Sequence, residues 1–380
     1  MQMGKLSDFS GSQPSGRLMS LDALRGFDML FIMGFAGLVT AVAHLFPGGV
    51  SDWFIAQMGH AQWDGLFHHD TIFPLFLFIA GVSFPYSFAK QQEAGASRGK
   101  IHWKIFRRAL VLILLGLVYN GLFRLQLDTL RFPSVLARIG LAWMFAALLF
   151  VHFGVRTRAV IAAVILLGYG FFCQFVGAPD APAGASPLSY EGCYAGYIDR
   201  MTLVPHMIGT TLDPEGILST LPAIVTAMLG MFTGEFIRRQ DNTLTGAKKA
   251  AYMAGAAVVL IGIGLLWNEF VPINKKLWSS SFVCTVGGYS LAMLALFYYL
   301  IDVRGYRKWT LFFRVIGLNS ITIYMAQRMI NFSFTSKFFL GGLASLLPES
   351  GAEVLYSAGY VAVCWLFLYF LYRQKIFLKV

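Results

Sequence analysis

The sequence predicts an all-α polytopic membrane protein, a bundle of about ten transmembrane helices with both termini in the cytoplasm. Of its 380 residues, 57% are hydrophobic and only 13% are charged, about half the charged fraction of a soluble domain. Apolar stretches of about 20 residues, long enough to cross a hydrocarbon core of about 30 Å, recur along the chain. The third observation is that Lys and Arg gather in alternate connections between these stretches.

The expected spans, in chain order, cover most of the sequence. They run over about residues 27–46, 70–89, 108–124, 134–153, 158–177, 216–237, 250–270, 279–301, 312–330 and 352–372. The residues 1–16 are polar and rich in Ser and Gly, which predicts a disordered cytoplasmic tail ahead of one transmembrane domain over 17–380. No cleavable signal sequence is evident, so we expect the first span to direct insertion.

Basic residues set the predicted orientation. One set of alternate connections, together with both tails, holds 21 of the 30 Lys and Arg residues, and the other set holds 6. Cytoplasmic connections carry such an excess, which places both chain ends inside and the connections 47–70 and 178–215 outside. The net charge of +11 therefore reflects membrane topology, and nucleic-acid binding is not expected.

Neither cysteines nor histidines suggest a metal centre. The four cysteines are scattered and form no CxxC motif, so no disulfide framework or zinc–cysteine site is expected. In a helix, His60, Asp64 and His68 would share one face, because they are spaced by four residues. There is, however, no HExxH pattern and no second cluster of ligands. We expect no metal.

The start of the first span carries charges at helical spacing. Asp22, Arg25 and Asp28 are three residues apart and would share a helix face. One interpretation is a helix start, with Asp22 at the positive end of the helix dipole. The other is that Arg25 faces a cytoplasmic cavity and receives an anionic substrate.

The segment from Gly59 to Gly81 places His60, Asp64, His68, His69 and Asp70 at the edge of an apolar run. His60 is either a solvated loop histidine or a functional base, and in the second case Asp64 or Asp70 would hold its tautomer. His68 and His69 are expected to be interfacial and auxiliary.

Two further spans begin or contain polar groups. Arg138 opens the fourth span on the outer side and is expected to snorkel or to pair with a carboxylate such as Asp64 or Asp70. Asn319 lies deep in the ninth span, where it provides either an interhelical hydrogen bond or a ligand contact.

The stretch "TLDPEGILSTLP" ahead of the sixth span is typical of a helix start. Asp213 suits the N-cap, Pro214 the first helical position and Glu215 the first turn. Its outward location also allows Asp213 or Glu215 to bind a cationic amino group.

A series of motifs resembles one family. "RLMSLDALRGFDM", "HAQWDGLFHHDTIFPLFLFIAG", "VLARIGLAW", "LDPEGILSTLPAI", "VPINKKLWSSSFV" and "FFRVIGLNSITIY" occur in the order seen in the heparan-α-glucosaminide N-acetyltransferase family, in particular its shorter bacterial relatives. The resemblance covers about residues 17–330. It implies a transmembrane acyltransferase domain in the bacterial inner (cytoplasmic) membrane. This domain would move acetyl from cytoplasmic acetyl-CoA, a co-substrate, to an amino sugar at the outer side.

The resemblance also implies residue roles. The family's active histidine lies in an H-A-x-W-[ND]-G block, which is matched here by His60 with Trp63 and Asp64. The family has an asparagine late in its first span, whereas this chain has Ala36 at about that place. Either Asp64 or Asp70 has taken over that role, or the acceptor chemistry differs.

The expected site therefore has three parts and several open alternatives. The expected catalytic residues are His60, Asp64 and Asp70, the donor-binding residues are Arg25, Arg108, Asn120, Arg138, Arg239 and Asn319, and the acceptor-binding residues are Trp63, Asp213 and Glu215. His60 acts either as the base or as the acetyl carrier. Other interpretations are an O-acyltransferase of a cell-envelope glycan and a secondary transporter, although no inverted repeat is visible. The expected partners are the acceptor sugar and the bilayer, and a homodimer is left open.

Overall fold

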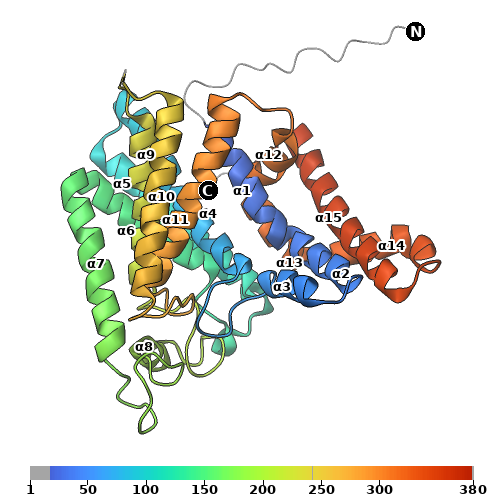
Figure 1. Cartoon of the computed structure of the whole chain (residues 1–380), viewed down its shortest axis with the longest axis horizontal. Helices are drawn as coiled ribbons and strands as arrows, with labels where there is room; N and C mark the ends of the chain where they lie inside the picture. The colour runs from blue at the N-terminus through green and yellow to red at the C-terminus, as the bar shows by residue number, and fades with distance from the viewer. Residues whose placement is uncertain (1–17, 242, 379–380) are drawn as a thin grey trace.

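The computed structural model describes residues 18–241 and 243–378, so the predicted tail over 1–16 lies outside the described residues. Within them the chain is α-helical and contains no β-strand, which confirms the predicted fold class (Figure 1). The α-helices are α1 Met19–Leu30, α2 Ala36–His44, α3 Gly49–Gln57, α4 His68–Glu93, α5 Arg98–Tyr119, α6 Val135–His152, α7 Val155–Phe175, α8 Tyr194–Leu203, α9 Thr220–Arg238, α10 Gly246–Trp267, α11 Ser280–Phe297, α12 Thr310–Leu318, α13 Ser320–Met329, α14 Phe332–Ala344 and α15 Glu349–Arg373.

Eight helical segments of the described chain are long and apolar enough to cross a membrane. They are Met19–His44, His68–Glu93, Val135–His152, Val155–Phe175, Thr220–Arg238, Gly246–Trp267, Ser280–Val303 and Glu349–Arg373. Each overlaps one expected span, so the prediction of a polytopic bundle is confirmed for these eight. They give the chain its multi-pass character.

The two remaining expected spans are less regular. The expected span 108–124 falls within and just beyond α5, whose first turns carry a run of Lys and Arg. The expected span 312–330 is divided into α12 and α13 at Asn319, whose backbone leaves the helical region (φ −125°, ψ 31°). The first span is also interrupted, because a π-helical stretch, Phe31–Phe35, separates α1 from α2.

Glycines bring helix backbones into direct contact. A Cβ atom on Gly230 of α9 would lie 2.1 Å from the Phe78 carbonyl oxygen of α4, and one on Gly81 of α4 would lie 2.2 Å from the Ala227 oxygen of α9. Gly26 of α1 and Gly317 of α12 make the same reciprocal approach. Small residues allow this packing in membranes, where association depends on close contact rather than on hydrophobic burial.

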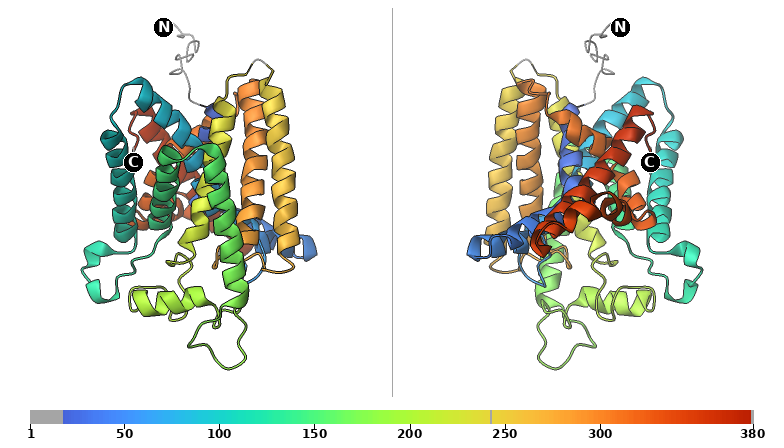
Figure 2. Two further views of the ribbon diagram at one scale, coloured as in Figure 1. Left: turned by 90° about the vertical axis from the view of Figure 1, so that its left-hand side faces the viewer. Right: turned by 90° about the vertical axis from the view of Figure 1, so that its right-hand side faces the viewer.

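The two ends of the bundle differ, as Figure 2 shows. At one end α4 is joined to α5, α9 to α10 and α11 to α12 by short connections, and these connections together with the helix turns next to them carry many of the basic residues. At the opposite end the connections are long. They comprise α3, α8 and the stretches 58–67, 120–134, 204–219 and 268–279. The second end contains most of the polar clusters described below.

The glycine contact between α4 and α9 predicts a position-specific loss of stability. We expect Gly230→Ala to lower the free energy of unfolding by about 1–3 kcal/mol, because the added methyl group must push two backbones apart. Gly255→Ala in α10 is the matched control, since a Cβ there meets nothing within 4 Å. Thermal unfolding in detergent measures both. Equal melting temperatures would contradict this account of the packing.

Candidate functional site

His60 and Asp70 form a pair at the end of the bundle with the long connections. His60 Nδ1 lies 2.7 Å from Asp70 Oδ1, and Asp70 Oδ2 accepts the backbone N–H groups of Ala61 at 3.1 Å and Phe67 at 3.2 Å. The Asp70 side chain is 1% exposed, whereas that of His60 is 55% exposed. Of the two carboxylates that the sequence offered to hold the ring, Asp70 is the one in contact.

The contact with Asp70 favours one tautomer of His60. The Asp70 carboxylate is held by two backbone donors, and when it accepts a hydrogen bond from the imidazole, Nδ1 carries the proton of the neutral ring. The lone pair is then on Nε2, to which no described residue donates a hydrogen bond. A half-exposed imidazole with a buried carboxylate behind it has the geometry of a general base or a nucleophile.

Lys275 completes the group, and the sequence did not predict it. It comes from the connection between α10 and α11, and its Nζ lies 3.2 Å from Asp70 Oδ1 and 3.0 Å from His60 Nδ1. Burial lowers the pKa of Lys275 from its ordinary value, and the charge of Asp70 offsets part of that effect. The sequence did contain one clue to Lys275: it is one of the few basic residues in the connections that were predicted to lie on the outer side of the membrane.

Two connections are held together to make this site. The Gly65 N–H donates to the Ile273 oxygen at 2.8 Å, and Asn274 Nδ2 donates to Asp64 Oδ1 at 3.3 Å. Gly65 has φ +114°, a conformation that favours glycine. The carboxylate of Asp64, predicted to be catalytic, therefore bonds to the second connection, and it is Asp70 that contacts the ring.

Trp63 lies in the same connection as His60 and contacts the connection between α7 and α8. Its Nε1 donates to the Leu188 oxygen at 2.9 Å, and its ring meets Tyr190 edge-on with centroids 5.3 Å apart. The Lys276 ammonium lies 5.9 Å from the Trp63 ring centroid and donates to the Gln62 oxygen at 2.6 Å. The predicted acceptor residue thus belongs to an aromatic wall beside the histidine loop.

The two neighbouring histidines pack against the site. The His69 ring centroid is 4.7 Å from that of His60, and the His68 ring is 4.4 Å from that of Phe31. Neither Nδ1 has a hydrogen-bond partner among the described residues, although both atoms are buried.

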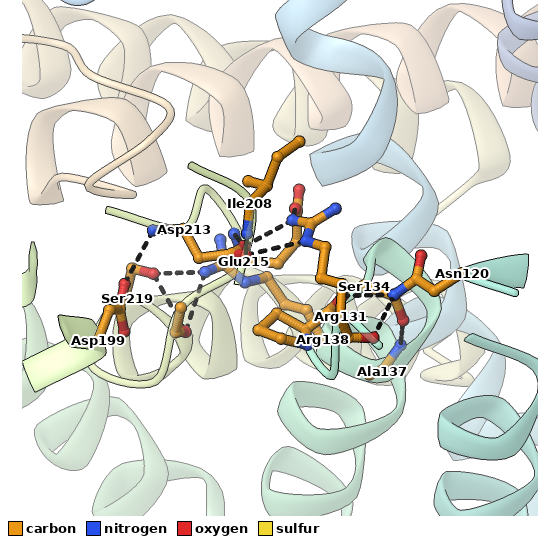
Figure 3. Close-up of polar contacts among 12 residues, drawn as sticks. Asn120, Arg131, Ser134, Ala137, Arg138, Asp199, Ile208, Asp213, Glu215 and Ser219 are labelled. Carbon is orange, nitrogen blue, oxygen red and sulfur yellow. Dashed lines mark hydrogen bonds and ion pairs between the residues drawn. The ribbon is translucent and has the colours of Figure 1, made fainter. Parts of the chain in front are cut away.

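A second polar cluster, shown in Figure 3, is centred on Arg131. Its guanidinium bonds to both oxygens of Asp213, at 2.9 and 2.6 Å, and to Glu215. Asp213 also accepts the Ile208 N–H at 2.9 Å. Burial alone would lower the pKa of Arg131, but the bonds to Asp213 and Glu215 raise it. Because its oxygens already have these donors, Asp213 has a structural function here, while Glu215 lies at the edge of the cluster.

The structure corrects the predicted start of the sixth span. Asp213 is not an N-cap, because α9 begins at Thr220 and Ser219 occupies the cap position. Instead, Asp213 accepts the Glu215 N–H at 2.9 Å, and Asp199 accepts the N–H groups of Asp213 at 3.2 Å and Ile217 at 3.0 Å. Burial raises the pKa of Asp199 to about 6, although these backbone bonds offset part of the effect. The ion pair and Asp199 hold this stretch as turns.

Arg138 lies at the same end of the bundle but does not bond to the expected carboxylates. Its side chain is buried, and its guanidinium donates to the Gly216 oxygen at 3.2 Å and to Ser219. The Trp278 ring centroid lies 5.0 Å from its guanidinium carbon. The predicted pairing with Asp64 or Asp70 is therefore wrong, because turn residues 216–219 supply the acceptors.

The two amides expected to bind the donor, Asn120 and Asn319, make structural bonds. Asn120 Nδ2 donates to the oxygens of Arg131 at 2.8 Å and Pro133 at 2.9 Å, which shapes the connection after α5 (Figure 3). Asn319 Nδ2 donates to the Ile376 oxygen at 3.0 Å, and its Oδ1 accepts from Thr322 at 3.2 Å. The first bond ties Asn319 to the segment after α15, which ends at Arg373, so it is a structural bond although its acceptor is not in a helix.

The remaining residues expected to bind the donor lie at or toward the end of the bundle with the short connections, opposite His60. Arg25 lies 3.9 Å from Asp22 in α1, close enough to Arg108 for their charges to interact. The Arg108 guanidinium stacks 4.2 Å from the Trp143 ring centroid. Arg239 is exposed at the end of α9. The predicted catalytic residues and these basic residues are thus separated along the bundle.

The Arg131 cluster predicts a large and specific stability loss. We expect Arg131→Met to lower the free energy of unfolding by about 3–5 kcal/mol, because Asp213 would remain buried without its partner. Arg124→Met removes a positive charge from an exposed position in the same connection and should cost less than about 0.5 kcal/mol. Unfolding in denaturant compares the two variants. Similar losses would show that Asp213 does not depend on this ion pair.

Comparison with known proteins relates the chain to two curated relatives. It is 29% identical over 417 aligned residues to the human protein heparan-alpha-glucosaminide N-acetyltransferase, and 29% identical over 421 to the mouse protein of that name. The alignments cover 96% and 97% of this chain but 60% and 62% of the relatives, so the chain spans about three fifths of their length. No family model matches. The relationship suggested by the motifs is supported along nearly the whole chain.

Proposed function

We propose that this protein is a transmembrane acetyltransferase that moves an acetyl group from cytoplasmic acetyl-CoA to the amino group of a sugar at the end of the bundle that holds His60. The observation that carries the proposal is the contact of the half-exposed His60 with the buried Asp70, which leaves Nε2 without a hydrogen-bond partner among the described residues. The names of the curated relatives support the reaction class and the acceptor class.

The pair has the chemistry that this reaction requires. An amino sugar is largely protonated at neutral pH, so its nitrogen must lose a proton before it attacks the thioester carbonyl. His60 Nε2 accepts that proton, the carbon–sulfur bond breaks as the amide bond forms, and the thiol of CoA leaves with a proton. A positioned base contributes about 10²–10⁴-fold to such a step.

The same geometry permits a two-step route. In that route Nε2 attacks the thioester, the CoA thiolate leaves, and the acetyl group is carried on His60 until the amine attacks it. Asp70 would stabilise the charged imidazole in either route, because it accepts the Nδ1–H bond in both.

The donor and acceptor are assigned to opposite ends of the bundle. Arg25, Arg108 and Arg239 lie at or toward the end with the basic connections, where they can bind the phosphate groups of CoA. Trp63 and Glu215 lie at the other end, where an aromatic wall and a carboxylate suit an amino sugar. This arrangement requires the basic end to face the cytoplasm, as in a bacterial inner membrane protein.

Cysteine labelling tests the orientation. A cysteine at Gly49, in α3, should react with an impermeant maleimide added to intact cells, and one at Gly99, in α5, only after permeabilisation. Both positions have space for a side chain, and the four native cysteines are buried, so they should react little. The reverse labelling pattern would place the His60 end in the cytoplasm and contradict the proposal.

Replacing the histidine tests the chemistry. We expect His60→Ala to reduce acetyl transfer to glucosamine by at least about 100-fold, the lower limit for a lost base, while acetyl-CoA binding and the melting temperature change little. His68→Ala and His69→Ala are the controls in the same segment and should each cost much less. A fully active His60→Ala protein would disprove the assignment.

Labelled acetyl-CoA added without an acceptor separates the two routes. Radiolabel retained on the peptide that contains His60 would indicate the acetyl-carrier route. Its absence, with transfer still active when glucosamine is added, would indicate direct attack.

A further inference from the structure

We propose that Lys275 is a positioning residue that opposes protonation of the His60 imidazole, by balancing the charge of Asp70. The inference rests on the proposed function, because it assigns a role in the same site. It assigns that role to a residue from the connection between α10 and α11, far in sequence from the histidine segment.

The geometry places one positive charge against both members of the pair. Lys275 Nζ lies 3.2 Å from Asp70 Oδ1 and 3.0 Å from His60 Nδ1, so the same Asp70 oxygen receives both the imidazole and the ammonium. The Lys275 side chain is largely covered, whereas His60 is open on its other side. The lysine is therefore fixed behind the ring and leaves the Nε2 face open to reactants.

The charges of Asp70 and Lys275 act on the His60 imidazole in opposite directions. A buried carboxylate beside a histidine stabilises the imidazolium, in which Nε2 is protonated and can neither accept a proton nor attack a carbonyl. A fixed ammonium beside the same ring opposes that effect. At 3.0 Å, even the dielectric constant of water leaves an interaction equivalent to about one pH unit.

Other charged groups around the ring do not replace Lys275. From α4 the ring faces Asp70 and His69, and from the connection before α11 it faces Lys275. Farther groups that act on Lys275 are Glu215 and Arg138, whose charges have opposite signs. Among the described residues, Lys275 is therefore the lysine or arginine in direct contact with the His60–Asp70 pair.

The adjacent lysine provides a matched control. Lys276 comes from the same connection, but its ammonium donates to the Gln62 oxygen and lies near the Trp63 and Tyr190 rings. Lys276→Met removes the same charge from the same connection without removing it from the pair. Lys275→Arg keeps the charge in place while changing the shape of the group.

The first test is the pH dependence of acetyl transfer by the full-length protein. We expect Lys275→Met to move the acid limb of the profile about one pH unit higher, so that activity lost at pH 7 is regained at alkaline pH. Lys275→Arg should restore the wild-type midpoint, and Lys276→Met should shift it much less. The proposal would be overturned if the midpoint of Lys275→Met were unchanged, or if this variant lost the same fraction of activity at every pH. It would also be overturned if Lys275→Arg failed to restore the midpoint.

The second test does not need transfer activity. Diethyl pyrocarbonate modifies neutral imidazole, so its rate of reaction at the His60 peptide, followed by mass spectrometry against pH, reports the fraction of neutral ring. We expect the midpoint of this curve to rise in Lys275→Met and not in Lys275→Arg. An inactive wild-type protein with this labelling pattern would reject the acetyltransferase function and keep the role of Lys275, whereas coincident labelling curves would reject the role of Lys275 alone.

Discussion

The direct contact of helix backbones at glycines is the constraint on which the rest of the structure depends. Lipid tails offer the helices no hydrophobic reason to associate, so dense packing must supply the attraction. Gly81 and Gly230 bring α4 and α9 together, and Gly26 and Gly317 do the same for α1 and α12. Because α4 begins at His68, its fixed position also fixes Asp70, on which the histidine pair is built.

The polar groups at the His60 end follow from a second constraint, the cost of burying charge. Asp70 is buried, and it is matched by two backbone N–H groups, one imidazole and one ammonium. Arg131 is matched in the same way by Asp213 and Glu215. Partnered charges of this kind are tolerated in an apolar surrounding, whereas unpaired ones are not. In the Arg131 cluster the charged groups bond to one another, whereas His60 has no hydrogen-bond partner for Nε2 among the described residues. We therefore assign the chemistry to His60.

Several details could be read in the sequence because they depend on local pattern. Apolar length gave eight of the spans, and the H-A-x-W block identified the histidine segment. The start of α9 was predicted wrongly from Asp213 and Pro214, because an ion pair with Arg131, about eighty residues away, outweighed the local capping signal. Asn120 and Asn319 were expected to bind the donor, and their amides instead donate hydrogen bonds to backbone oxygens that no local pattern reveals.

The sequence by itself determined the fold class, the succession of apolar helices and the segment that contains the proposed active histidine, since hydropathy and residue spacing are properties of neighbouring residues. Only the tertiary structure decided that Asp70, rather than Asp64, contacts His60, and that Lys275 stands behind both. Asp64 and Asp70 are both close to His60 in sequence, and the choice between them depends on how the chain turns at Gly65 and is held by Ile273. Lys275 reaches the pair across more than two hundred residues because α4 and α11 pack side by side and their connections meet at one end.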